Sequence, residues 1–128
     1  MRLVMQTILG EHGNCMRACL ASIFDVPIEE CPDLSAEYDS GGNWWALLTE
    51  WCKTRDLSPR FEYTPCEPPK GYSMAGGASP RDIGRGHSCV ALGGEIVHDP
   101  HPDGGGLSSI EDYIWFVNVG EKEQEATK

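Results

Sequence analysis

The chain has 128 residues and a formal net charge of -10 at pH 7. This length suits one domain with its own hydrophobic core. With only ten basic residues against twenty acidic ones, no basic stripe is available to neutralise a phosphate backbone, so we expect no nucleic-acid partner.

The N-terminal residues 1–9 are too short and too interrupted for a secretory signal, and no apolar run approaches the length of a membrane span. We therefore expect no membrane association and a cytoplasmic location in a bacterial cell. Thiols stay reduced in that compartment, so the six cysteines are expected to be free, catalytic or metal-bound.

Residues 15–24 have the apolar spacing of a helix, and Asn14 stands where an N-cap is expected. Cys15 then lies in the first helical turn, where free backbone N–H groups and the helix dipole stabilise a negative charge. This placement predicts a nucleophilic thiol with a lowered pKa. The preceding residues 2–9 are predicted to form an extended arm that carries Gln6.

The middle of the chain is predicted to hold a single helical turn at 28–31, a polar loop over 33–42 and a second helix over 43–56. Asn43 is the expected cap of this second helix. Its buried face is expected to consist of large apolar residues, namely Trp44, Leu47, Leu48 and Trp51.

Strands are predicted in the second half, at residues 60–63, 72–75, 87–92, 95–98 and 113–119, with a glycine-rich loop over 76–86. Gly93 and Gly94 favour a tight hairpin turn between the third and fourth of these strands. Helices come first and antiparallel strands last, which indicates an α+β domain over 1–120. The charged residues 121–128 are expected to be a disordered tail.

The predicted hairpin opens with His87 and closes with Asp99. An imidazole can take the proton of a thiol and return it to a leaving group, and a carboxylate can hold that imidazole in the useful tautomer. Together with Cys15, these residues form a candidate Cys-His-Asp triad. The remaining cysteines are interpreted as structural.

This order of elements resembles that of papain-like cysteine hydrolases. The chain is similar in style to double-glycine-leader peptidases, which process bacteriocin precursors, and to small uncharacterised phage proteins. The cysteine motif of those peptidases, roughly Asp-Cys-Gly-x-Ala-Cys-Leu, is matched by Asn14-Cys15-Met16-Arg17-Ala18-Cys19-Leu20. Their histidine strand and the Asp-Pro that follows it are matched by His87-Ser88-Cys89-Val90 and Asp99-Pro100.

The resemblance implies a small papain-like fold, with N-terminal helices packed on a C-terminal antiparallel sheet. It also implies a peptidase or amidase that hydrolyses a peptide, protein or small amide through an acyl-enzyme, with no cofactor. Gln6 and the Cys15 N–H are assigned to the oxyanion, although the family glutamine lies six residues before the cysteine and Gln6 lies nine before it (15 − 6). Asn14, His101 and Trp45, the last expected to be exposed, are candidates to line the cleft.

Several alternatives stay open at this stage. The same residues are suited to transfer of the acyl group to an amine. A non-catalytic binding or inhibitory module, phage-encoded and directed at a host factor, is the main alternative to an enzyme. A small metal-binding protein is a third, because the chain holds zinc-type ligands at His12, Cys15, Cys19, His98 and His101, although without a paired Cys-x-x-Cys. The sequence leaves the oligomeric state open.

Overall fold

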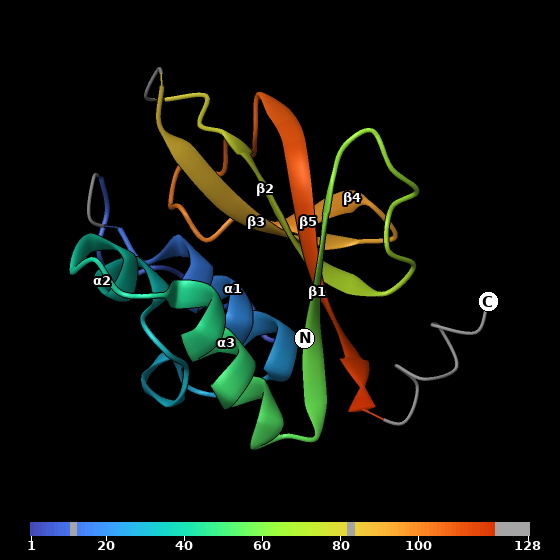
Figure 1. Ribbon diagram of the computed structural model, residues 1–128. Helices are drawn as coiled ribbons and strands as arrows, with labels where there is room; N and C mark the ends of the chain where they lie inside the picture. Colours follow the sequence, from blue (N-terminus) through green and yellow to red (C-terminus); the bar gives the residue numbers. More distant parts are fainter. Residues whose placement is uncertain (11–12, 82–83, 120–128) are drawn as a thin grey trace.

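Helices cover one side of an antiparallel sheet in the computed structural model, which describes residues 1–10, 13–81 and 84–119 (Figure 1). The elements, in chain order, are α1 (Cys15–Phe24), the 3-10 turn η1 (Ile28–Glu30), α2 (Leu34–Asp39), α3 (Trp44–Lys53), β1 (Leu57–Tyr63), β2 (Tyr72–Ala78), β3 (Gly86–Leu92), β4 (Glu95–His98) and β5 (Ser109–Asn118). The predicted α+β class is confirmed. The predicted tail over 121–128 lies outside the described residues.

The five strands lie in the order β1-β5-β2-β3-β4, and every neighbouring pair is antiparallel. The hairpin between β3 and β4 is confirmed, and its turn residues Gly93 and Gly94 have φ values of 62° and 91°, which glycine adopts without strain. β1 forms one edge of the sheet, and this position accommodates Pro59 inside the strand. The predicted start of this strand at residue 60 is therefore three residues late.

The core lies between α1, α3 and the sheet. Its fully or nearly fully buried members include Cys19, Leu20, Leu34, Leu48, Cys52, Met74, Val90 and Ile114. α1 has the predicted bounds and packs against β3. This contact sets the N-terminus of α1 against the start of β3, and so determines where the site forms.

The predicted loop over 33–42 is wrong, because α2 occupies most of it. The Asp33 carboxylate caps this helix by accepting the Ala36 N–H at 3.1 Å. Leu34 is the only residue of α2 that the core buries. A helix that needs one apolar contact carries no repeated apolar spacing in its sequence, so the pattern that predicts helices is missing here.

Other predicted boundaries also shift. α3 ends at Lys53 instead of residue 56, whereas its predicted cap is confirmed, since Asn43 Oδ1 accepts the Ala46 N–H at 3.0 Å. β2 continues three residues into the predicted glycine loop, and β5 begins four residues earlier than expected, at Ser109. Gly77 makes this pairing possible, because a Cβ there would collide with the Ser109 carbonyl oxygen.

Asn14 has a different role from the predicted one, since its side chain does not cap α1. Its Oδ1 accepts the N–H groups of Thr7 and Ile8, each at 3.0 Å, and its Nδ2 donates to Thr7 Oγ1 at 2.8 Å. Asn14 is buried, with 2% of its surface exposed. The side chain therefore fastens the N-terminal arm to the start of α1.

The arm is extended, as predicted, and is held along its length by hydrogen bonds. His98 Nε2 donates to the Val4 carbonyl oxygen at 2.7 Å, and the Gln6 N–H donates to the Pro100 carbonyl oxygen at 3.0 Å. The Val4 N–H in turn donates to Ser22 Oγ at 3.0 Å. These contacts fix Gln6 beside the loop that follows β4.

Replacing Asn14 with Ala should release the arm without unwinding α1. The variant loses three hydrogen bonds, each worth about 0.5–1.5 kcal/mol of stability. Amide hydrogen exchange at Thr7 and Ile8 should become markedly faster, because both N–H groups lose their acceptor.

Asn43→Ala is the matched control, because it removes an asparagine that does cap its helix. It should lower the free energy of unfolding by about 1 kcal/mol. Exchange at Thr7 and Ile8 should become faster only by as much as this loss of global stability accounts for. Unchanged exchange at these two amides in Asn14→Ala would contradict the anchoring role.

Candidate active site

Cys15 is the first residue of α1, and its side chain faces the start of β3. The Ser88 N–H and hydroxyl and the Met16 N–H lie where they favour a negative charge on the Cys15 sulfur. Burial nevertheless raises the pKa of the Cys15 thiol above its ordinary value, and these groups oppose the rise only in part. The predicted lowering of this pKa is therefore wrong, since burial outweighs the helix N-terminus.

His87 and Asp99 form a close pair. His87 is the second residue of β3, Asp99 directly follows β4, and the hairpin brings His87 Nε2 to 2.7 Å from Asp99 Oδ1. Both side chains are nearly buried, with 6% and 5% of their surface exposed.

The protonation of this pair follows from its surroundings. Burial alone would raise the pKa of Asp99, but the hydrogen bonds from His87 and from the backbone N–H groups of His101 and Gly106 outweigh it and lower that pKa. Burial lowers the pKa of His87, although Asp99 opposes this. A charged Asp99 beside a neutral His87 places the ring proton on Nε2, which leaves Nδ1 as a lone-pair acceptor.

Cys15, His87 and Gln6 open onto one cavity of about 190 Å³, which is also lined by Gly10, Gly13, Met16, Ser35, Arg85, Gly86 and Ser88. The structure thus brings the predicted nucleophile, base and oxyanion donor around a common space. They come from three separate segments: the start of α1, the start of β3 and the N-terminal arm.

Gln6 reaches this cavity despite the longer loop before Cys15. Its Nε2 donates to the Ile8 carbonyl oxygen at 2.8 Å, which uses one of its two N–H groups. Its Oε1 is buried and has no hydrogen-bond partner among the described residues. Gly13 lies against this amide, since a Cβ there would stand 3.1 Å from Gln6 Nε2.

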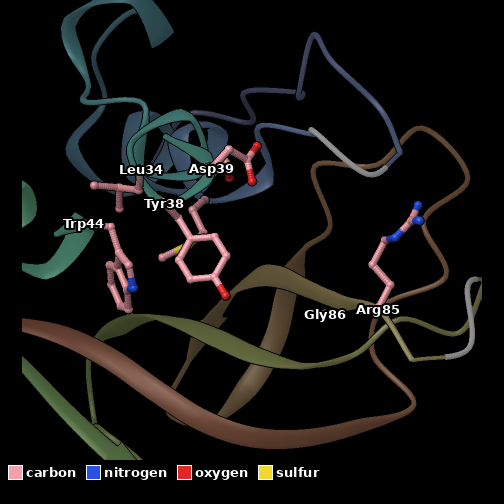
Figure 2. A pocket seen from close by; sticks show the side chains of 8 residues that line it. Leu34, Tyr38, Asp39, Trp44, Arg85 and Gly86 are labelled. Atoms are coloured by element: carbon pink, nitrogen blue, oxygen red, sulfur yellow. The ribbon is translucent and has the colours of Figure 1, made fainter. Parts of the chain in front are cut away.

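A second cavity of about 350 Å³ adjoins the first and shares with it Met16, Ser35, Arg85 and Gly86. Its other lining residues are Leu34, Tyr38, Asp39 and Trp44. In Figure 2 the side chains of Tyr38 and Trp44 lie at one end of this cavity and that of Arg85 at the other. We refer to the two adjoining cavities together as the groove, which is lined by Cys15 in the smaller cavity and by Tyr38 and Trp44 in the larger one.

The three predicted cleft residues have other surroundings. Asn14 is buried and holds the arm. Trp45, which was expected to be exposed, is half-buried and packs against the core, with its ring centroid 6.2 Å from that of Phe61. The neighbouring Trp44 lines the larger cavity instead. The His101 ring lies 6.2 Å from that of His87, and its Nδ1 accepts the Asp103 N–H at 3.1 Å.

Cys89 was interpreted as structural, yet it lies within the site. It offers a sulfur within 4.8 Å of ligand atoms of His87 and Asp99, and these three donor types suit zinc. Burial, reinforced by the Asp99 carboxylate, raises the pKa of Cys89 to about 12, so a metal would have to displace a proton from this thiol. This group differs from the ligand set that the sequence suggested. His12 of that set lies outside the described residues, and the His98 ring is hydrogen-bonded to the Val4 carbonyl oxygen.

Ser88 and Arg81 are the other residues that the sequence did not indicate. Ser88 follows His87 directly, but its effect on the Cys15 thiol depends on how α1 packs on β3. Arg81 follows β2 and lies 3.8 Å from Asp99 through its Nη1. No sequence pattern relates Ser88 to Cys15 or Arg81 to Asp99, so only the tertiary structure connects these two residues to the candidate triad.

The chain matches no protein-family model, no curated protein and no solved structure. The interpretation of the site therefore depends on its own geometry. Within the described ranges, no helix is both long enough and apolar enough to cross a bilayer.

The lowered pKa of His87 predicts that the protein loses stability as the pH falls from about 6.5, the ordinary value for histidine. In this range the unfolded chain takes up a proton at residue 87 and the folded protein resists doing so, so protonation favours unfolding. Urea unfolding at pH 7.5 and pH 5.5 should show this loss, and His87→Gln should show a smaller one. An equal loss in both proteins would contradict the neutral state of His87.

Proposed function

We propose that the protein is a cysteine-dependent hydrolase, a peptidase or amidase, in which Cys15 is the nucleophile, His87 the base and Asp99 its orienting group. One observation carries this proposal: His87, held by Asp99 through Nε2, and Cys15, at the start of α1, line the same cavity. We further propose that the fold is a small papain-like one, in keeping with the order of its elements.

The reaction begins from a neutral pair, since burial raises the pKa of Cys15 and lowers that of His87. As the sulfur attacks the amide carbonyl, its proton passes to Nδ1 of His87, and the imidazolium that forms is stabilised by Asp99. The same proton then goes to the leaving amine, and a thioester to Cys15 remains. A water activated by His87 hydrolyses this thioester and restores the thiol.

Two kinds of donor stabilise the charges that develop. Ser88, through its N–H and hydroxyl, favours the Cys15 thiolate. The Cys15 N–H and the second N–H of Gln6 Nε2 are the proposed donors to the oxyanion of the tetrahedral intermediate. Gln6 is suited to this role because it lines the same cavity and the arm holds its backbone at Pro100.

The groove beside Cys15 supports a peptide, protein or small amide as substrate. Met16, Leu34 and Trp44 give it apolar walls, and Tyr38 leaves 68% of its surface exposed at its edge. A pocket of this size with a few polar groups suits an organic side chain. The six cysteines are all unpaired, which is in keeping with the reducing cytoplasm of a bacterial cell, where we place the protein.

A non-catalytic binding module is the second candidate, and the raised pKa of Cys15 favours it. A thiol that stays protonated at neutral pH is a poor nucleophile unless His87 takes its proton. In this alternative, the groove serves as a binding surface, for example for a host factor.

Acyl transfer to an amine would use the same residues as hydrolysis and differs only in what attacks the thioester.

Alkylation by iodoacetamide, followed by peptide mass mapping, separates the two candidates. Cys15 should react before the fully buried Cys19, Cys52 and Cys89, because it opens onto a cavity. In the wild-type protein this reaction should proceed at neutral pH with the help of His87. In His87→Ala it should require alkaline pH, with a midpoint above that of an ordinary thiol, because burial raises the pKa of Cys15 and no base is left to take its proton.

Cys66, which is half-exposed, provides an internal control in the same sample, and its labelling should not respond to His87→Ala. Identical pH profiles for Cys15 in both proteins would show that His87 does not assist the thiol. That result would favour the binding module.

A further inference from the structure

The larger cavity of the groove is a second space beside the proposed nucleophile. Its volume is about 350 Å³, which is room for on the order of ten water molecules. Met16, which directly follows Cys15 in α1, lines both cavities, as do Ser35, Arg85 and Gly86. A substrate bound at Cys15 can therefore extend into the larger cavity without leaving the groove.

Two capped helices supply the apolar walls of this cavity. Leu34 is the first residue of α2 and Trp44 the first residue of α3. The caps of these helices, Asp33 and Asn43, hold both starts in place. Leu34 is 1% exposed, and the Trp44 ring packs edge-to-face on that of Trp45, with 5.7 Å between their centroids. Both walls are therefore fixed before a ligand binds, so little ordering of side chains opposes binding.

The side chains that line the cavity suit an aromatic ring. Trp44 and Tyr38 line it with rings of their own, and Met16 lines it with a thioether. Both kinds of group attract a further ring more strongly than the buried area alone accounts for. Tyr38 is 68% exposed and makes no ring contact with another aromatic residue of the described chain, so a bound ring would cover it.

The charge of the lining favours a neutral side chain. Among the described residues that line the cavity, Asp39 and Arg85 are the charged ones, and their formal charges cancel. A cationic or anionic group of a ligand would lose hydration here without meeting a net opposite charge. The occupant that fits the lining is therefore uncharged, apolar and aromatic.

The position of His87 decides which part of a substrate reaches this cavity. In the proposed reaction the leaving amine takes its proton from His87, so that amine lies in the smaller cavity, which His87 lines. His87 does not line the larger cavity, which begins at Met16. The acyl part, which stays bound to the Cys15 sulfur, is then the part that extends past Met16.

We propose that the larger cavity binds an aromatic side chain on the acyl side of the amide that Cys15 attacks, so that the substrate is a peptide or amide of an aromatic acyl residue. The placement relative to the scissile bond rests on the proposed function, whereas the binding of an aromatic group beside Trp44 does not. A substrate with glycine at this place, such as a double-glycine leader, would leave the cavity unfilled.

Acylation by two activated esters tests the side-chain preference. The p-nitrophenyl esters of N-acetylphenylalanine and N-acetylglycine share one leaving group. With each, the Cys15 sulfur bonds to the acyl carbon, p-nitrophenolate departs, and the thiol proton passes through His87 to solvent. Mass spectrometry after acid quenching gives both rates, and the half-exposed Cys66 gives the intrinsic reactivity of each ester. Relative to Cys66, Cys15 should prefer the phenylalanine ester by roughly ten- to a hundredfold.

Two variants connect this preference to the cavity. Trp44→Ala removes the aromatic wall and Tyr38→Ala the ring at the edge, and each should lower the phenylalanine-to-glycine ratio at Cys15. Tyr38 is exposed, so its loss is compatible with folding even if Trp44→Ala fails to fold. Trp45→Phe is the matched control, because Trp45 packs on Phe61 and does not line the cavity. It should leave the ratio unchanged.

Binding alone is measured by NMR in Cys15→Ala, where no acylation of residue 15 occurs. Titration with N-acetylphenylalanine amide should shift the indole N–H signal of Trp44, assigned by its loss in Trp44→Phe. The signal of Trp45, the next residue, should move far less. N-acetylglycine amide, which lacks the ring, should shift neither signal.

Equal acylation of Cys15 by both esters, together with an unmoved Trp44 signal, would overturn the aromatic site and leave the proposed hydrolase standing. A preference that Trp44→Ala and Tyr38→Ala both retain would also overturn it, because the ring would then bind elsewhere. If no ester acylates Cys15 and the Trp44 signal still moves, the hydrolase and the acyl-side placement fail. The cavity would then stand as an aromatic-binding site alone.

Discussion

The hydrogen bond between His87 and Asp99 is the interaction on which the candidate site depends. Both side chains are almost fully buried, and a buried carboxylate needs several donors to remain charged. Asp99 obtains them from the imidazole and from two backbone N–H groups, and the Arg81 guanidinium lies 3.8 Å from its other oxygen. The β3–β4 hairpin and the loop after it hold the three donors around one carboxylate, and the tautomer of His87 follows from that arrangement.

Cys15, the proposed nucleophile, is positioned independently, by the packing of α1 on β3. Buried small residues of the helix, Ala18 and Ala21, allow a close approach to the sheet, and Cys15 then meets Ser88 at the start of the strand. The N-terminal arm completes the site from a third direction. The Asn14 side chain does not cap α1 and is hydrogen-bonded to the arm instead. This contact helps to hold Gln6 at the edge of the cavity.

The sequence predicts the structure correctly where a local pattern determines it, and it does not where tertiary contacts decide. The apolar spacing of residues 15–24 fixes α1, and the Gly93-Gly94 pair fixes the hairpin that joins His87 to Asp99. By contrast, α2 buries only Leu34 and so has no periodicity to detect.

The electrostatics of the site also depend on tertiary structure. A helix N-terminus alone predicts a lowered pKa for Cys15, but the sequence does not show how deeply the sulfur is buried, and burial reverses the direction. In the same way, Arg81 and Cys89 approach Asp99 only after β2, β3 and β4 have paired. Arg81 has no motif spacing to the candidate triad, and the position of Cys89 two residues after His87 does not show that it lies near Asp99.

The central claim, that Cys15 is a nucleophile served by His87, is tested most directly by trapping the acyl-enzyme. Brief incubation with p-nitrophenyl acetate at neutral pH, acid quenching and mass spectrometry of the intact and digested protein would locate the acetyl group. We expect one acetyl group on Cys15 in the wild-type protein and a large loss of it in His87→Ala. Acetylation that avoids Cys15, or that proceeds equally without His87, would show that Cys15 is not a nucleophile activated by His87.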